Sequence, residues 1–228
     1  MRVAEIFHSI QGEGRLAGVP SVFIRTSGCN LRCVWCDTPY TSWEPEGEEK
    51  SLDDIIVEAK SYPTRHAVLT GGEPLIAPEI EALSERLKAE NFHITIETAA
   101  TVFKPVRCDL MSLSPKLANS TPWKRDDGRF AWMHEQRRLD IAAIEEFIGR
   151  YDFQLKFVAE REDDFAEIED ILEKLGGVDR ARVLVMPQGQ TREELAERAP
   201  WVVELCKTHG FTYCPRLHIE IWGNRRGT

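Results

Sequence analysis

Three cysteines stand close together in residues 28–38, GCNLRCVWCDT, at positions 29, 33 and 36. Thiolates are strong ligands for zinc and for iron–sulfur clusters. A structural zinc site takes four ligands, so zinc here would need a further cysteine or histidine from far along the chain. A four-iron cluster also usually takes four thiolates, and three leave one iron without a protein ligand. Because a metal with an open position can bind a small molecule, Cys29, Cys33 and Cys36 predict a reactive centre.

Polar or glycine-rich residues also follow three other short apolar segments. Residues 71–74 read GGEP, Glu97 and Thr98 close the next apolar run, and residues 114–116 read SPK. Paired glycines let the backbone approach a ligand closely, and the following proline stiffens the exit. Taken alone, GGEP equally fits a plain strand-to-helix turn. Its meaning therefore depends on what surrounds it.

Short apolar, partly β-branched runs predict six strands, at residues 21–25, 67–70, 93–98, 110–113, 153–158 and 182–186. Amphipathic helices are expected between them, one starting at Ser51 and another near Pro78, and a capping box is expected from Thr191 to Glu194. Strands that alternate with helices predict a mainly parallel α/β sheet, and six are too few for a closed eight-stranded barrel. We therefore expect an abbreviated, incomplete (β/α)6-type barrel, with a long loop over residues 119–130 near its open side.

In such folds the loops after the carboxyl ends of the strands carry the chemistry. The cysteine loop, the GGEP segment, Glu97–Thr98 and residues 114–116 should therefore meet on one rim. The chain is expected to form a single domain over residues 1–228, because no linker-like composition interrupts it.

Composition narrows the class of protein. The chain has 228 residues, 42% of them hydrophobic and 29% charged, with a net charge of -9. This acidic balance argues against a general nucleic-acid binder, which would show a basic face. No signal peptide or membrane-length apolar run is apparent, so we expect a cytoplasmic protein without membrane attachment. Thiols stay reduced there, which favours metal binding over disulfides.

The cysteine spacing C-x3-C-x2-C, with an aromatic residue before the last cysteine, resembles the radical S-adenosylmethionine (SAM) superfamily. The GGEP segment is similar to a motif of that family whose backbone meets the methionine amino group. The resemblance implies that Cys29, Cys33 and Cys36 hold a [4Fe-4S] cluster. It also implies that SAM occupies the fourth iron and yields a 5'-deoxyadenosyl radical after one-electron cleavage.

Five further segments resemble the 7-carboxy-7-deazaguanine synthase family. They are residues 5–14 (EIFHSIQGEG), 18–25 (GVPSVFIR), 36–38 (CDT), 112–116 (SLSPK) and 216–224 (RLHIEIWGN). The resemblance implies conversion of 6-carboxy-5,6,7,8-tetrahydropterin to 7-carboxy-7-deazaguanine and ammonia by radical ring contraction. SAM would be regenerated, and the product would serve 7-deazapurine or queuosine biosynthesis, the latter being tRNA modification. It further implies a homodimer and a reducing electron donor such as a flavodoxin.

The same resemblance assigns roles to individual residues, with no side chain acting as a catalytic acid or base because the cofactor carries the radical. The SAM-binding residues would be Trp35, Cys36, Asp37, Gly72, Ser114, Pro115 and Lys116. The substrate-binding residues would be Ile10, Gln11, Gly12, Glu13, Arg25 and Thr70. Thr38 would hold Mg2+ together with substrate oxygens, although its position alone suggests a helix-capping residue.

Several assignments stay open at this stage. Glu13 could bind the aminopyrimidine edge of the pterin or only hold its turn, and Glu97 could meet the ribose or only the barrel wall. His218 is expected in a carboxyl-terminal strand or tail near the site. A glycyl-radical activating enzyme shares the cysteine spacing, but it would not explain Gln11 or Arg25. A zinc-stabilised interaction domain or an electron carrier would make the three cysteines structural.

Overall fold

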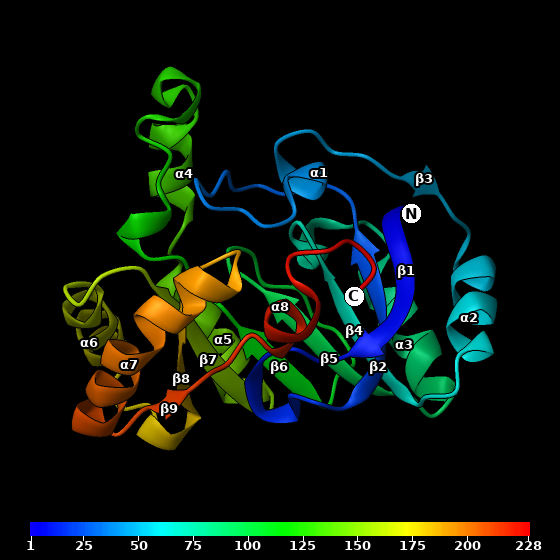
Figure 1. The fold of residues 1–228 in the computed structure, drawn as a ribbon. Coiled ribbons are helices and arrows are strands. Elements are labelled where there is room, and N and C mark those ends of the chain that lie inside the picture. The colour runs from blue at the N-terminus through cyan, green and yellow to red at the C-terminus, as the bar shows by residue number, and fades with distance from the viewer.

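A nine-stranded mixed sheet is the frame of the computed structural model, which describes residues 1–228 (Figure 1). The strands are β1 (Arg2–Ile10), β2 (Pro20–Thr26), β3 (Glu48–Glu49), β4 (His66–Gly71), β5 (His93–Thr98), β6 (Leu110–Leu113), β7 (Phe153–Ala159), β8 (Val183–Pro187) and β9 (Thr212–Tyr213). The α-helices are α1 (Pro39–Ser42), α2 (Leu52–Ser61), α3 (Ile80–Ala89), α4 (Ala131–Arg137), α5 (Ile141–Arg150), α6 (Asp164–Lys174), α7 (Arg192–His209) and α8 (Leu217–Trp222).

The strand order is β3-β1-β2-β4-β5-β6-β7-β8-β9. The strands from β2 through β9 in this order pair in parallel, whereas β1 pairs antiparallel with both β2 and β3. The sheet therefore has two edges, β3 and β9, and does not close on itself. The six strands predicted from the sequence are β2, β4, β5, β6, β7 and β8, which confirms the incomplete, mainly parallel (β/α) architecture. Strand β9 adds a seventh parallel strand.

Helices pack on the sheet through the apolar faces that the sequence predicted. Helix α2 starts at the cap residue Ser51, whose hydroxyl accepts the N–H of Asp54, and it buries Ile55, Ile56 and Ala59. Helix α3 buries Ile80, Leu83 and Leu87. The capping box at Thr191 and Glu194 is present at the start of α7. Together these faces and the strands bury one core cluster of 37 residues, which holds the rim loops in place.

Several elements differ from the sequence expectation. The two-residue edge strands β3 and β9 were not predicted. Strand β1 was not predicted, because Glu5, His8 and Ser9 interrupt its apolar pattern and a register shift lies between Val3 and Glu5. The carboxyl-terminal strand expected around His218 is wrong: the chain forms helix α8 there, with Ile219 as its buried residue. Its short length and mixed polarity leave little periodicity to read.

The predicted long loop at residues 119–130 is mostly irregular, with short 3-10 turns at Ala118–Ser120 and Arg125–Gly128. It leads into α4, and Figure 1 shows this part of the chain projecting from the sheet. The carboxyl terminus returns instead to the neighbourhood of β1. No helix has the length and apolar character that crossing a lipid bilayer requires.

Candidate active site

A cavity of about 440 Å³ lies at the carboxyl ends of the parallel strands. Its wall contains every site residue predicted from the sequence except Pro115, which is buried: the lining includes Ile10, Gln11, Gly12, Glu13, Arg25, Cys29, Cys33, Trp35, Cys36, Asp37, Thr38, Thr70, Gly72, Ser114 and Lys116. The rim expected from the strand ends is thus one continuous site. Its size suits small ligands.

The loop that carries the three cysteines, residues 28–38, is held by backbone contacts from distant segments. The N–H of Arg32 donates to Nδ1 of His134 at 3.0 Å, and the N–H of Val34 donates to the carbonyl of Ser120 at 2.8 Å. Nε2 of His134 lies 2.9 Å from the Ser120 hydroxyl. Because Nδ1 accepts a hydrogen bond, His134 is neutral, and burial lowers its pKa to about 4.

The thiols of this loop fit a cluster better than a single metal ion. No group of three or more His, Cys, Asp or Glu side chains is gathered tightly enough to hold one ion. A tetrahedral zinc needs all its ligands about 2 Å from one centre, whereas thiolates of an iron–sulfur cluster bind different irons. Burial raises the pKa of Cys29 to about 12, so this thiol is protonated at neutral pH unless a bound metal stabilises its thiolate.

The GGEP segment brings backbone against the cysteine loop. Glu73 is fully buried, and its carboxylate accepts hydrogen bonds from Thr98 Oγ1, Ala99 N and Leu75 N at 2.7–3.1 Å. A Cβ atom added to Gly72 would lie 2.2 Å from the carbonyl oxygen of Gly28 and 2.7 Å from Cβ of Cys29. Glu73 therefore locks the turn, and Gly72 permits its close approach to the first cysteine.

The remaining residues predicted to bind SAM surround the same wall. Nζ of Lys116 donates to the hydroxyl and carbonyl oxygens of Ser114 at 2.8 Å each. Trp35 packs against Val158, Leu184 and Met186, and its buried indole N–H has no hydrogen-bond partner. This part of the wall therefore combines an apolar surface with an unused donor, a combination that suits a nucleoside.

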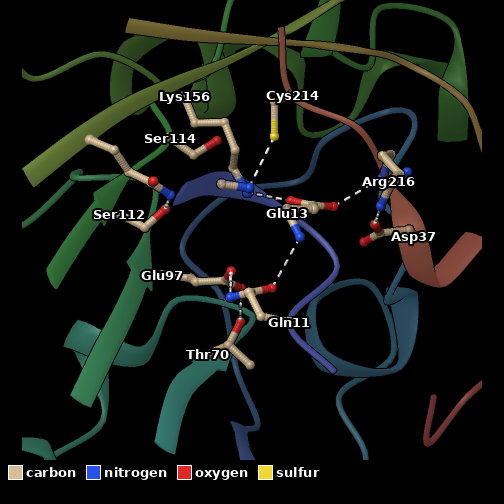
Figure 2. A network of polar contacts seen from close by, with 12 residues as sticks. Gln11, Glu13, Asp37, Thr70, Glu97, Ser112, Ser114, Lys156, Cys214 and Arg216 are labelled. Carbon is tan, nitrogen blue, oxygen red and sulfur yellow. Dashed lines mark hydrogen bonds and ion pairs between the residues drawn. The ribbon is translucent and has the colours of Figure 1, made fainter. Parts of the chain in front are cut away.

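On the opposite side, the turn after β1 faces two strand ends (Figure 2). The side-chain N–H of Gln11 donates to Glu97 Oε1 at 3.1 Å, and Thr70 Oγ1 donates to Glu97 Oε2 at 3.1 Å. The side-chain carbonyl of Gln11 accepts the N–H of Glu13 at 3.2 Å. Glu97, whose role the sequence left open, thus fixes both Gln11 and Thr70 in the cavity wall.

This turn is anchored by residues from the far end of the chain. The N–H of Gly14 donates to Sγ of Cys214 at 3.1 Å, and the N–H of Leu217 donates to the carbonyl of Gly12 at 3.0 Å. A Cβ atom on Gly12 would lie 1.9 Å from Nδ1 of His218. The α8 segment therefore packs directly on the turn, and His218 lines the cavity as a helical residue.

Arg25 presents part of its guanidinium to the cavity. Its Nε donates to Glu5 Oε1 at 2.7 Å, and the Tyr40 hydroxyl donates to the same carboxylate oxygen at 2.7 Å. Neither Nη atom has a hydrogen-bond partner in the protein. Glu5 therefore orients Arg25 from one side and leaves its two terminal nitrogens for an anion.

Thr38 occupies the cap position of α1, but its side chain makes no cap hydrogen bond. Its Oγ1 accepts the Thr41 hydroxyl at 3.4 Å and lies 3.9 Å from Sγ of Cys36. The side chain of Thr38 therefore does not cap the helix, although its position suggests that role. Thr38 lines the cavity beside the cysteine loop.

Four charged residues of the cavity received no role in the sequence analysis, namely Lys156, Arg216, Arg225 and Arg226, and the first two form ion pairs inside it. Lys156 pairs with Glu13 from the middle of β7, and Arg216 pairs with Glu13 and Asp37 from the segment before α8. The signal for Lys156 was its place beside Gln154 at alternate positions of an otherwise apolar strand, which marks a polar inner face. Burial alone would raise the pKa of Glu13, but Lys156 and Arg216 lower it by more, so this carboxylate stays charged.

Comparison with known proteins fits this geometry. Residues 23–118 match the family model of the radical SAM superfamily. A 7-carboxy-7-deazaguanine synthase of Rhodopirellula baltica is 47% identical over 227 residues, which cover 99% of this chain and 88% of the relative. The chain belongs to the 7-carboxy-7-deazaguanine synthase family. A relative of the same name from Halobacterium salinarum is 46% identical, covering 97% of this chain and 90% of its own length.

The fold agrees with that of a solved structure. QueE from Escherichia coli superimposes with a TM-score of 0.69 at 24% identity, over 95% of this chain and 94% of the other. Membership of the radical SAM superfamily implies a [4Fe-4S] cluster and SAM. The three half-buried thiols on one cavity wall, with the close backbone approach at Gly72, fit these groups.

Proposed function

We propose that the protein is a 7-carboxy-7-deazaguanine synthase that converts 6-carboxy-5,6,7,8-tetrahydropterin to 7-carboxy-7-deazaguanine and ammonia. One observation carries the proposal: the cysteine loop and the Gln11–Glu13 turn face each other across one cavity. A radical formed at the first can therefore reach a substrate held by the second. The glycyl-radical activating alternative gives no reason for this polar turn.

Residues on one side of the cavity would bind the cluster and SAM, and residues on the other side would bind the substrate. Cys29, Cys33 and Cys36 would hold the cluster, which together with SAM supplies a carbon radical after one-electron reduction. Gly72, Ser114, Lys116, Trp35 and Asp37 would hold SAM. The protein's task is then to orient both ligands and exclude water.

On the substrate side, the free Nη atoms of Arg25 would take the pterin carboxylate as a fork. Glu97 and the backbone of the turn offer acceptors and donors for the pterin ring. The stacked rings of Phe7 and Phe23, 4.9 Å between centroids, give this half an apolar wall. A planar heterocycle fits between such surfaces.

Thr38 would contribute one oxygen to a Mg2+ ion that also binds substrate oxygens. Magnesium keeps several waters and needs few protein ligands, so the hydroxyl of one cavity-lining residue suffices. The missing cap bond of Thr38 supports this role. From the family resemblance we further propose a low-potential electron donor such as a flavodoxin and a homodimeric assembly. We also propose a cytoplasmic location, where the loop thiols would stay reduced.

A turnover assay tests the function. Anaerobically reconstituted protein with SAM, a reductant and the carboxypterin should form 7-carboxy-7-deazaguanine, identified by mass spectrometry. Cys33→Ala should abolish this activity. Cys206→Ala is its matched control and should retain the activity, because Cys206 is buried in the core away from the cavity. Iron-loaded protein that cleaves SAM but leaves the carboxypterin unchanged would contradict the proposed substrate.

A further inference from the structure

Arg216 links both halves of the cavity through one side chain (Figure 2). Its Nε donates to Glu13 Oε1 at 3.0 Å, its Nη2 donates to Asp37 Oδ2 at 2.5 Å, and its Nη1 donates to the carbonyl of Gly189. The side chain is only 7% exposed. Glu13 belongs to the turn on the substrate side, and Asp37 follows directly after the third cysteine.

The ionic network that Arg216 completes is balanced. Lys156 holds the other carboxylate oxygen of Glu13, so two carboxylates face two cations. Removing one member would leave an uncompensated charge in a buried place, which is costly. The network therefore connects the cysteine loop, the substrate turn and β7 as one unit.

Only a guanidinium can make these three contacts at once. Its planar N–H donors diverge toward Glu13, Asp37 and Gly189, whereas an ammonium is a compact point charge at the end of a flexible stem. A lysine at this position would keep the charge and lose at least one of the partners. The loss would let the two halves of the cavity move relative to each other.

We infer that Arg216 is a positioning residue that sets the separation between the cofactor side and the substrate side of the cavity. The inference rests on the proposed function. Hydrogen abstraction by a carbon radical depends on the alignment of the two reacting atoms, and a shift of about 1 Å can cost on the order of 100-fold in rate. Loosening this link should leave radical formation intact and separate it from product formation.

The test compares Arg216→Lys with Arg192→Lys. Arg192 also ties α8 to the body, through the carbonyl of Ile221, but it is exposed and does not line the cavity. Two quantities are measured: the 5'-deoxyadenosine released per product in reconstituted enzyme, and the Kd of the carboxypterin for iron-free protein. Iron content and Tm report whether each variant is loaded and folded.

We expect Arg216→Lys to raise the ratio of 5'-deoxyadenosine to product at least tenfold and to weaken pterin binding severalfold, with normal iron content. Arg192→Lys should change neither quantity. An unchanged ratio in Arg216→Lys, or an equal change in Arg192→Lys, overturns the inference because the role would then be only to hold α8. If Arg216→Lys does not fold, Asp37→Asn must raise the ratio, and an unchanged ratio there also overturns it. If the wild-type protein forms no product, the proposed function is wrong. If the wild type forms product but Arg216→Lys keeps the wild-type ratio, only the positioning role of Arg216 is wrong.

Discussion

Replacing Gly72 by alanine should disable the site through a single methyl group. The added Cβ would lie 2.2 Å from the carbonyl oxygen of Gly28, whereas ordinary contact begins at 3.4 Å, so one of the two backbones must move by about 1.2 Å. Neither neighbour can simply rotate away, because one contact is backbone and the other is Cβ of Cys29. Either the backbone that carries the first cysteine or the Gly72 turn packed against it must therefore shift, and both changes alter the contact between them.

The expected loss follows from that displacement. A shift of about 1 Å at a reacting centre can cost on the order of 100-fold in rate, and overpacking costs about 1–3 kcal/mol of stability. We expect product formation by Gly72→Ala to fall about 100-fold or more, with reduced iron content or weaker SAM binding. Turnover, iron per chain and the free energy of unfolding in urea measure the three effects.

Gly149→Ala is the matched control. Gly149 lies in α5, and a Cβ atom there meets nothing within 4 Å, so the same chemical change should leave turnover unaltered and stabilise the helix slightly. If Gly72→Ala folds with the iron content and turnover of the wild type, the close approach at Gly72 has no bearing on the cysteine loop and the steric argument is wrong.

Four further predictions concern the same site. Alanine at any of the three loop cysteines should abolish iron binding and turnover, whereas Cys206→Ala should retain both; iron and product assays decide this. Thr38→Ala should weaken the response of turnover to added magnesium while cluster absorbance and SAM cleavage persist, and an identical magnesium titration would refute the ligand role. Substrate deuterated at C6 should place label in recovered SAM, whereas consumption of one SAM per product would contradict regeneration. The pKa of His134 is lower in the folded chain than in the unfolded chain, so the unfolded chain takes up a proton first as the pH falls from 6.5 to 4. About 3 kcal/mol of the free energy of unfolding should therefore be lost over that range. Urea unfolding at several pH values should show a flatter pH dependence for His134→Gln, and equal slopes would count against a buried neutral imidazole.

The sequence predicted those parts of the fold whose signals are local. The apolar runs of the six parallel strands and the buried face of α2 come from periodicity, and Ser51 and Thr191 mark helix starts by their capping chemistry. The cysteine loop and Gly72 were found because spacing and residue type alone restrict what they can do. Strand β1 was missed because Glu5, His8 and Ser9 interrupt its apolar pattern and its register shifts between Val3 and Glu5.

The long-range parts of the site could not be predicted. Arg216 and Glu13 are separated by 203 residues, and the sequence around either residue gives no indication that the two form an ion pair. Glu97 was noticed at a strand end, but its two partners depend on the register between β4 and β5 and on the position of the turn after β1. Such contacts follow from topology, which short-range patterns do not fix.

The anchoring of the first turn by the last segment has a consequence for synthesis. Gly14 and Cys214, which form a hydrogen bond, lie 200 residues apart. At roughly 5–20 residues per second, the ribosome needs on the order of 10–40 s between them. During this interval the cysteine loop has already been made, while the turn opposite lacks its support. We therefore expect the growing chain to assemble the two walls of the cavity in sequence, and to reach the arrangement that protects a radical only when the last residues emerge.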